Sequence, residues 1–238
     1  MLRLFIDLPI VADQPLTLPP DAARHVQVLR LQPGQPVVLF NGQGGEWQAE
    51  VVAMGRRDVE VRPLAHVAVD RERPGQVVLA VGMPANDRFD WLVEKATELG
   101  AHAIQPLTCE RSVLRVSGER AERKTAHWQG IAVAAAEQCG RTCVPTVHAP
   151  LALPAFLAAL PDRSTPRRLL LSLHPSAVAW EAAATGTDEL LLLSGPEGGL
   201  SAAEESAALA RGFQAVSLGR RVLRAETAPL ACLARLPD

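Results

Sequence analysis

The chain has 238 residues, of which 48% are hydrophobic and 21% are charged, and its net charge is −2. This composition is that of a globular protein and excludes a disordered or fibrous chain. No apolar run reaches the roughly 18 residues that a membrane span needs, and the first residues lack the apolar core of a secretory signal, so we expect a cytoplasmic protein. The net charge argues against nonspecific coating of nucleic acid but is compatible with a specific RNA site.

The N-terminal part, residues 1–72, reads as short strands separated by turns. Asn41-Gly42 is a strong hairpin signal, and a helix start follows Pro19-Pro20-Asp21. This pattern predicts a small β-barrel or sandwich. The expected strands are 3–8, 36–40, 46–54 and 58–64.

A charged, turn-rich stretch at 70–75 predicts a linker, and residues 73–238 then alternate between strands and helices. Continuous apolar runs such as LLLLS are typical of a parallel sheet covered on both faces. We therefore expect an α/β second domain. Its expected strands are 76–83, 102–107, 168–174, 189–195 and 213–218, and its expected helices are 90–100, 119–139 and a segment from Ser201.

The cysteines and histidines predict no metal site. Cys139 and Cys143 form the one close pair, and no second pair completes a tetrahedral zinc site. We interpret all four cysteines as free thiols in a reducing compartment. The histidines are too scattered for a metal cluster.

Residues 194–201, SGPEGGLS, follow a buried strand and precede a helix that begins with the capping box Ser201-x-x-Glu204. A loop in this position lies at the carboxyl end of a strand, where open α/β sheets bind ligands. It lacks the spacing of a phosphate-binding or dinucleotide-binding loop. Bare peptide at three glycines and one proline suits an uncharged ring system, although a tight turn without a ligand fits the loop equally well.

A second glycine turn, Leu218-Gly219, ends a later strand and leads through RRVLRAETAP into a helix. We expect it to face the first loop across a crevice from a neighbouring strand. Two loops of this kind would form a pocket.

Several separated segments together resemble one family. SGPEGGLS and LGRRVLRAETA, with residues 91–107, CERS at 109–112 and 128–145, are similar to the uridine N3-methyltransferases of 16S ribosomal RNA, in the SPOUT or trefoil-knot superfamily. HVQVLR at 25–30 and Phe40-Asn41-Gly42 resemble the PUA-like RNA-binding barrel of that family. One segment departs from it: residues 84–88 read PANDR where members often carry Pro-Lys-Gly before an Arg.

The resemblance implies the fold class and the partners. It implies a PUA-like barrel at 1–72, a SPOUT α/β methyltransferase domain at 73–238 with a trefoil knot, and S-adenosylmethionine as cofactor. It also implies a homodimer and, as substrate, 16S ribosomal RNA within the small ribosomal subunit, with no metal and no membrane.

The resemblance also assigns candidate site residues. Uridine N3 must lose a proton to attack a methyl group, so the site needs a base or a cation. Arg224 could bind a uridine carbonyl oxygen, and Glu226 could accept the proton or orient Arg224. An exposed ion pair or helix-cap pair is the alternative for these two. We expect Glu197 to be structural or to contact the cofactor, and His174 has an alternative as a strand-end histidine. The candidate cofactor residues are Leu173, His174, Gly195, Glu197, Gly198, Leu218, Gly219, Val222 and Leu223. The candidate RNA-binding residues are Arg24, Arg30, Arg88, Arg111, Arg115, Arg120, Arg123 and Lys124, of which the last five could also form a solvated helix face.

Two other functions stay open at this point. A noncatalytic RNA-binding or ribosome-assembly factor with the same fold is favoured by the missing lysine near Ala85. A methyltransferase with another RNA target would share the same loops. A dinucleotide oxidoreductase is disfavoured because no G-x-G-x-x-G follows a strand.

Overall fold

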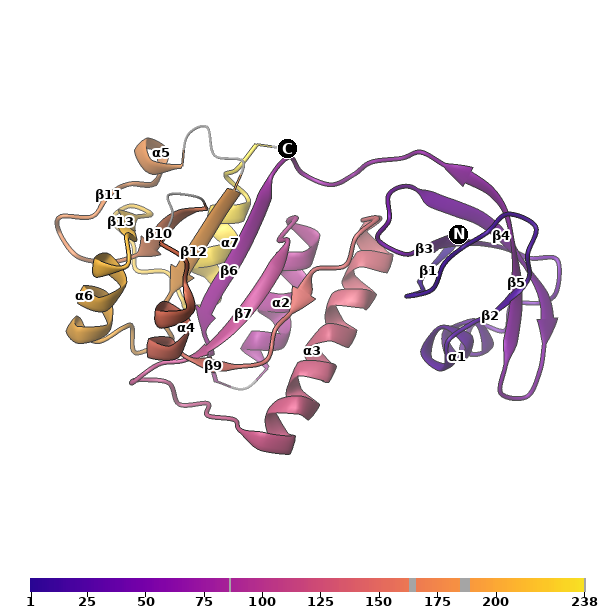
Figure 1. The fold of residues 1–238 in the computed structure, drawn as a ribbon, viewed down its shortest axis with the longest axis horizontal. Helices are drawn as coiled ribbons and strands as arrows, with labels where there is room; N and C mark the ends of the chain where they lie inside the picture. Colours follow the sequence, from indigo (N-terminus) through magenta and orange to yellow (C-terminus); the bar gives the residue numbers. More distant parts are fainter. Residues whose placement is uncertain (86, 163–165, 185–188, 238) are drawn as a thin grey trace. The chain divides into compact units, whose positions relative to one another are not determined.

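A computed structural model describes residues 1–85, 87–162, 166–184 and 189–237. The chain forms two compact units: unit 1 is Met1–Glu72 with Ala136–Val144, and unit 2 is Arg73–Ala135 with Pro145–Asp238. Figure 1 shows the elements of each unit in chain colours. The expected division after residue 72 leaves 136–144 in the second domain, whereas the structure groups that segment with unit 1.

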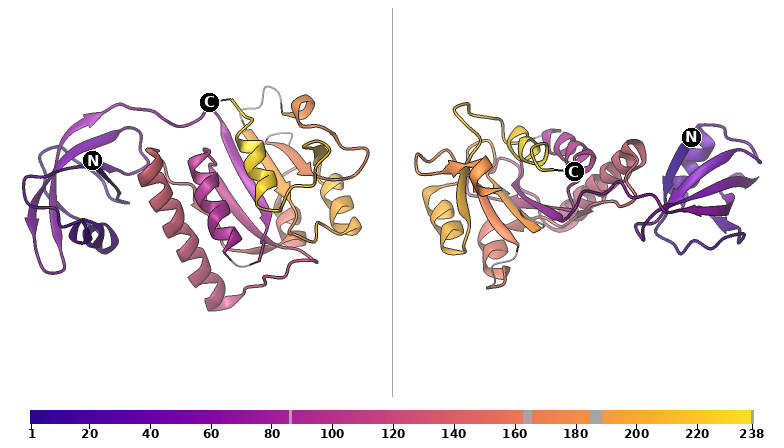
Figure 2. Two further views of the ribbon diagram at one scale, coloured as in Figure 1. Left: turned by 180° about the vertical axis from the view of Figure 1, so that it is seen from behind. Right: turned by 90° about the horizontal axis from the view of Figure 1, so that it is seen from above.

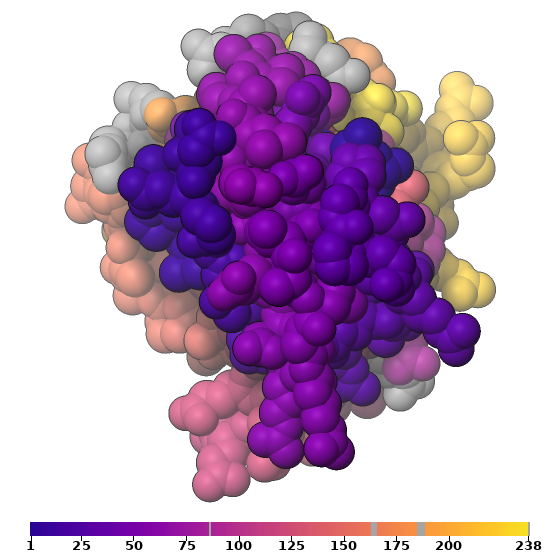
Figure 3. Space-filling view, turned by 90° about the vertical axis from the view of Figure 1, so that its right-hand side faces the viewer, coloured from indigo at the N-terminus to yellow at the C-terminus, as the bar shows by residue number. Residues whose placement is uncertain are grey.

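Unit 1 is a mostly antiparallel sheet with one helix. The strand order is β1-β3-β4-β5-β2, and only the β1–β3 pair is parallel. The apolar side chains of the sheet pack with Ala22, Ala23 and Val26 of the helix in one core. In Figure 3 the β4–β5 hairpin projects from the surface of this unit. The elements are β1 (Leu2–Phe5), β2 (Leu16–Thr17), α1 (Pro20–Val28), β3 (Pro36–Phe40), β4 (Glu46–Met54) and β5 (Val59–Val67).

The segment 136–144 belongs to unit 1 because polar groups of the sheet bind it. The Glu137 carboxylate accepts a hydrogen bond from the backbone N–H of Phe5 at 2.9 Å. The Glu72 carboxylate accepts from Arg141 at 2.8 Å and from the N–H of Thr142 at 2.9 Å. Arg3 donates to the Arg141 carbonyl at 2.9 Å. These bonds join positions far apart in sequence, which a pattern of local periodicity does not reveal.

Unit 2 is a parallel sheet covered by helices on both faces, as the apolar runs predict. The strand order is β11-β13-β10-β12-β6-β7-β8, with β9 paired to β7. Figure 2 shows α2 and α7 on one face and α4 and α6 on the other. The elements are β6 (Gln76–Gly82), α2 (Arg88–Glu98), β7 (Ala103–Thr108), α3 (Gly118–Cys139), β8 (Thr146–Val147), β9 (Leu151–Ala152), α4 (Leu153–Ala159), β10 (Arg167–Leu171), β11 (Val178–Ala179), α5 (Trp180–Ala183), β12 (Glu189–Ser194), α6 (Ala202–Ala210), β13 (Gln214–Ser217) and α7 (Thr227–Leu233).

The sheet order corrects one expectation about the two glycine loops. The strand before the second loop, β13, does not adjoin β12, because β10 lies between them and pairs with both. The expected strand 168–174 also ends early, at Leu171, because the Ser172 hydroxyl accepts the His174 N–H at 3.0 Å and turns the chain. The carboxyl end of β10 therefore lies between the two loops.

Candidate functional site

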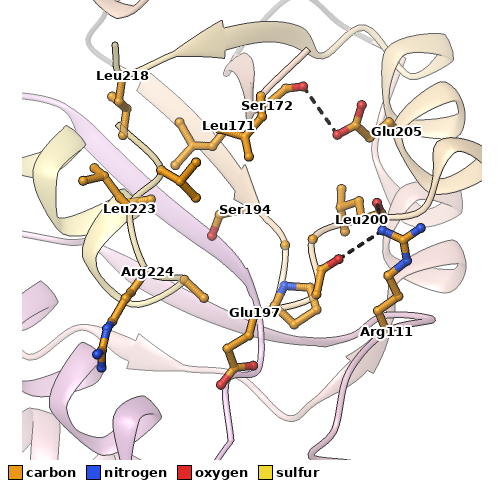
Figure 4. A pocket seen from close by; sticks show the side chains of 18 of the residues that line it. Arg111, Leu171, Ser172, Ser194, Glu197, Leu200, Glu205, Leu218, Leu223 and Arg224 are labelled. Atoms are coloured by element: carbon orange, nitrogen blue, oxygen red, sulfur yellow. Dashed lines mark hydrogen bonds between the residues drawn. The ribbon is translucent and has the colours of Figure 1, made fainter. Parts of the chain in front are cut away.

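A cavity of about 610 Å³ lies at the carboxyl ends of β10, β12 and β13. Its volume falls within the range of small-molecule sites. Figure 4 shows apolar side chains on one part of its wall and charged side chains on another. It is lined by Arg88, Arg111, Leu171, Ser172, Leu173, Ser194, Gly195, Pro196, Glu197, Gly198, Gly199, Leu200, Glu205, Val216, Leu218, Gly219, Arg221, Val222, Leu223, Arg224, Ala225 and Ala228.

The first loop, residues 195–200, is packed so closely that it requires glycine. A Cβ on Gly195 would lie 2.8 Å from the Leu200 nitrogen. Gly199 has a φ of +68°, which favours glycine, and its N–H donates to the Pro196 carbonyl at 2.8 Å. Behind the loop, a Cβ on Gly82 would lie 2.5 Å from Pro196. The loop therefore presents bare backbone to the cavity.

The start of α6 fixes the far end of this loop. The Ser201 hydroxyl accepts from the Glu204 N–H at 3.3 Å, and the Glu204 carboxylate accepts from the Ser201 N–H at 2.9 Å. The predicted capping box is therefore present. The same carboxylate also accepts the Glu110 N–H at 2.8 Å, so Glu204 ties the segment after β7 to the loop.

Two of the arginines predicted to bind RNA contact the first loop. Arg111 donates to the carbonyls of Gly198 at 3.0 Å and Leu200 at 3.3 Å. Arg88 forms an ion pair with Glu197 at 3.3 Å, and the Glu197 carboxylate also accepts the Ala85 N–H at 2.8 Å. Glu197 thus helps to hold the loop, and it also lines the cavity. Asn86, in the segment that departs from the family pattern, lies outside the described residues.

The second loop, residues 218–226, has few contacts by comparison. Gly219 has a φ of +109°, and its N–H donates to the Ser217 hydroxyl at 3.3 Å. Arg221, Val222 and Arg224 are exposed. Within the described part of the chain, the Arg224 guanidinium has no hydrogen bond or ion pair. Its charge is therefore available to a ligand.

The candidate catalytic and cofactor residues are mostly brought together. The cavity is lined by Arg224 and by all the candidate cofactor residues except His174. His174 is exposed and does not line the cavity, and its Nδ1 lies 2.7 Å from the Ser176 hydroxyl and accepts the Ser176 N–H at 3.2 Å. Glu226 is 6% exposed and does not line the cavity. It therefore forms no exposed ion pair with Arg224 and makes no side-chain cap bond at the start of α7.

The other candidate RNA-binding residues lie away from the cavity. Arg24 and Arg30 are exposed on unit 1. Arg115 donates to the Glu110 carbonyl at 2.8 Å, and the Lys124 ammonium lies 5.9 Å from the Trp128 ring centre. Arg120 and Arg123 are exposed on α3, and Arg123 pairs with Glu119 at 3.5 Å.

Sequence reasoning missed several residues of the cavity. Arg221 lies within the quoted second loop and could have been named from its position there. Ser172 and Glu205 had no such signal, because the contact between these two side chains depends on the position of β10 beside β13. The lining residues outside both quoted loops, which were missed altogether, are Leu171, Ser172, Glu205 and Val216. Seven more lie within the quoted loops without having been named as candidates: Ser194, Pro196, Gly199, Leu200, Arg221, Ala225 and Ala228.

Burial shapes the chemistry of two side chains near the loops. Burial, with the nearby charge of Glu204, raises the pKa of the Cys109 thiol to about 12, so this thiol stays protonated and is a poor nucleophile at neutral pH. Ser194 is 3% exposed, and its hydroxyl has no hydrogen-bond partner among the described residues.

Within the described part of the chain, no group of three or more His, Cys, Asp or Glu side chains could hold a metal ion.

Family models match both units. A model described as an RNA methyltransferase domain matches residues 71–237, and one described as an RNA methyltransferase PUA domain matches residues 18–64. This chain belongs to the RNA methyltransferase family. The resemblance that the loop sequences indicate is thereby confirmed at the level of the family.

Relatives of this RNA methyltransferase include two named ribosomal RNA small subunit methyltransferase E. The one from Synechocystis is 35% identical over 98% of this chain and 76% of its own length. The one from Bacillus subtilis is 31% identical over 89% of this chain and 84% of its own.

Solved structures of similar proteins cover nearly the whole chain. A ribosomal RNA small subunit methyltransferase E from Neisseria gonorrhoeae, bound to S-adenosylmethionine, has a TM-score of 0.90 at 34% identity, covering 98% of this chain and 95% of that one. A methyltransferase from Legionella pneumophila with bound S-adenosylmethionine has a TM-score of 0.91 at 33% identity, with the same coverage.

In the described part of this chain, no helix is both long and apolar enough to cross a bilayer.

Proposed function

We propose that this RNA methyltransferase uses S-adenosylmethionine to methylate N3 of a specific uridine in the 16S RNA of the small ribosomal subunit. The observation that carries the proposal is the cavity, which two loops matching the family pattern line together with an exposed arginine. The names of the relatives support the substrate class, and the solved neighbours support the cofactor. The choice of N3 rests on the resemblance of the loop sequences.

The cavity fits a nucleoside cofactor. Leu171, Leu218 and Leu223 offer an apolar wall suited to a flat ring, and the bare backbone of the first loop offers N–H and C=O groups to the ring edge. Side chains at Gly195 and Gly198 would collide with the Leu200 backbone and with Arg111, so glycine at both positions lets the loop keep the shape that offers these groups. When bound there, S-adenosylmethionine supplies an electrophilic methyl group. The protein's task is to position the uridine and to stabilise its charge.

Arg224 is the candidate catalytic residue that the geometry supports best. Uridine N3 carries a proton at neutral pH, and its removal leaves negative charge shared with the adjacent carbonyl oxygens. A guanidinium beside one of these oxygens stabilises that charge as it develops. Arg224 lines the cavity, is exposed, and has no other partner among the described residues.

Glu226 is the second candidate catalytic residue, and its placement gives it less support. Its side chain is buried off the cavity, and one carboxylate oxygen, Oε2, has no hydrogen-bond partner within the described residues. To accept the uridine proton, this carboxylate would have to reach the cavity when RNA binds. A Glu226→Gln variant that kept normal turnover would remove it from the mechanism.

Basic residues outside the cavity support RNA binding by both units. Arg24 lies within the PUA match at 18–64, as does Arg30. Arg120, Arg123 and Lys124 lie on α3. Because the chain has a net charge of −2, we propose that the shape of an assembled subunit contributes more to recognition than general attraction to phosphate does.

We further propose that the protein acts in the cytoplasm as a homodimer and that its C-terminal part forms a trefoil knot. Leu173 and Val222, at the cavity rim, are 71% and 75% exposed, and two apolar side chains so exposed suit burial in a subunit interface. Light scattering on the purified protein measures the mass directly. A monomer at working concentration would contradict the dimer.

The experiment that tests the function is methyl transfer from labelled S-adenosylmethionine to unmodified small ribosomal subunits, beside protein-free 16S RNA. Mass spectrometry of the digested product identifies the modified nucleoside. We expect 3-methyluridine in the subunits. Methylation at another nucleoside would correct the target, and binding to subunits without transfer would favour the assembly factor.

A further inference from the structure

We infer that Glu205 binds the ribose hydroxyls of the cofactor and so selects a ribonucleoside in this cavity. The inference rests on the proposed use of S-adenosylmethionine and names one group of the protein that recognises it. It begins with the carboxylates of the cavity, which among the described residues are Glu197 and Glu205.

The two carboxylates differ in what they already bind. Glu197 accepts from the Ala85 N–H at 2.8 Å and pairs with Arg88 at 3.3 Å, so it is engaged in holding the first loop. The Glu205 carboxylate makes one contact among the described residues, a hydrogen bond from the Ser172 hydroxyl at 3.4 Å. Glu204, the next residue along α6, is taken up by the capping box and the Glu110 N–H. Glu205 is therefore the carboxylate that can accept donors from a ligand.

The position of Glu205 favours the ribose over other donors of the cofactor. Figure 4 shows Ser172 and Glu205 on the side of the cavity opposite to Arg224 and Glu197. The reacting methyl group has to lie near Arg224, if Arg224 stabilises the uridine. In the cofactor, the sulfur is joined to the 5′ carbon, and the 2′ and 3′ hydroxyls lie on the opposite face of the sugar ring, along the edge away from the ring oxygen. With the sulfur towards Arg224, that edge faces Glu205.

The chemistry of the pair agrees with this placement. Two adjacent hydroxyls match the two oxygens of one carboxylate, and an acidic side chain binds ribose hydroxyls in the same way in dinucleotide-binding folds. The Ser172 hydroxyl accepts the His174 N–H at 3.0 Å and donates to Glu205, which holds the carboxylate at the cavity wall. Hydrogen bonds to a charged acceptor are among the stronger ones in proteins.

Calorimetry on the full-length protein tests this inference with three probes: S-adenosylhomocysteine, its 2′,3′-dideoxy analogue, and 5′-methylthioadenosine, which lacks the amino-acid part. We expect Glu205→Ala to raise the Kd for S-adenosylhomocysteine and for methylthioadenosine about tenfold and to leave the Kd for the dideoxy analogue unchanged. Glu205→Gln, which keeps one acceptor oxygen, should give about a threefold effect. The control is Glu189→Ala, since Glu189 is exposed and lies outside the cavity.

Each other outcome has a definite meaning. An equal loss for the dideoxy analogue, or a loss confined to S-adenosylhomocysteine, would show that Glu205 contacts another part of the ligand and would overturn the inference. Unchanged binding of all three probes would do the same. If the unmodified protein bound none of them, the proposed cofactor itself would be wrong. Thermal unfolding of the unliganded variants establishes that they are folded.

Discussion

The two loops of the cavity share glycine turns but differ in how the protein holds them. The first loop, 195–200, is fixed by Arg111, by the bonds of Glu197, and by the capping box at Ser201. The second loop, 218–226, has short-range bonds at Gly219 and at the start of α7, and its arginines are exposed. One wall of the site is thus formed before a ligand binds, and the other can adapt to it.

This difference suggests that the first loop binds the cofactor and the second loop binds the RNA. A fixed wall of backbone suits a small ligand of constant shape, because no ordering cost is incurred on binding. A less constrained loop bearing Arg221 and Arg224 suits the larger and more variable RNA. Substitutions in the two loops should therefore affect different steps of the reaction.

The largest expected effect is on turnover, from the second loop. Arg224→Ala should lower turnover at saturating cofactor about 100-fold or more, as loss of one charge-stabilising donor does in other enzymes. The unfolding midpoint should stay unchanged because Arg224 is exposed. The Kd for S-adenosylhomocysteine should stay unchanged because the proposed partner of the guanidinium is the uridine. Single-turnover methyl transfer measures the chemical step, and calorimetry measures the Kd. Near-normal turnover with cofactor bound would contradict the electrostatic role.

In the first loop, Gly195→Ala should act on stability and cofactor binding together. The added Cβ meets the Leu200 nitrogen at 2.8 Å and the Gly199 carbonyl carbon at 2.9 Å, and such overpacking costs about 1–3 kcal/mol. Gly130→Ala on α3 is the matched control, since the added Cβ meets no atom within 4 Å. This substitution should raise the free energy of unfolding by about 1 kcal/mol, because alanine has a higher helix propensity than glycine. Urea unfolding compares the pair. Equal effects would show that the loop is not closely packed.

A smaller effect is expected from releasing the first loop. Arg111→Ala removes the donors to the Gly198 and Leu200 carbonyls and should raise the Kd for S-adenosylhomocysteine about tenfold, with less change in turnover at saturation. Hydrogen exchange at the Gly199 amide should become faster. Arg123→Ala, at an exposed pair on α3, should change neither quantity. A binding loss as large for Arg123→Ala would point to a general charge effect.

The smallest expected effect is on stability, from the hydroxyls of Ser172 and Ser194 at the carboxyl ends of β10 and β12. Ser194→Ala should raise the free energy of unfolding of the unliganded protein by about 1 kcal/mol, because the buried hydroxyl has no partner among the described residues. Ser172→Ala should lower it by about the same amount, since that hydroxyl is bonded to His174 and Glu205. Urea titrations of both variants give the comparison. A loss of stability in Ser194→Ala would mean that the hydroxyl is bonded in solution.

The parts of the site that could be predicted depend on neighbours in sequence. The capping box and the glycine turns follow from residues a few positions apart, and the structure contains them. The contact of Arg111 with Gly198 spans 87 residues and could not be predicted from periodicity. The same holds for β10, whose position between β12 and β13 brings Ser172 to the cavity and into contact with Glu205 of α6.

The fold shows the same limit. The long apolar strands and the helix at 119–139 were predictable, because each is long enough to show its period. The two-residue strands β2, β8, β9 and β11 were not, since they show no period at all. The membership of 136–144 in unit 1 depends on the bonds of Glu72 and Glu137, which join positions far apart in the sequence.

That membership has a consequence for how the protein is made. Synthesis proceeds from the N-terminus, and N-terminal domains commonly begin to fold before the rest of the chain has emerged. Here the partners of Phe5 and Glu72, and one partner of Arg3, are translated only after residues 73–135 of unit 2 have been synthesised. The first unit to be started is therefore completed late, and a fragment ending at Glu72 would lack the segment that these polar groups bind.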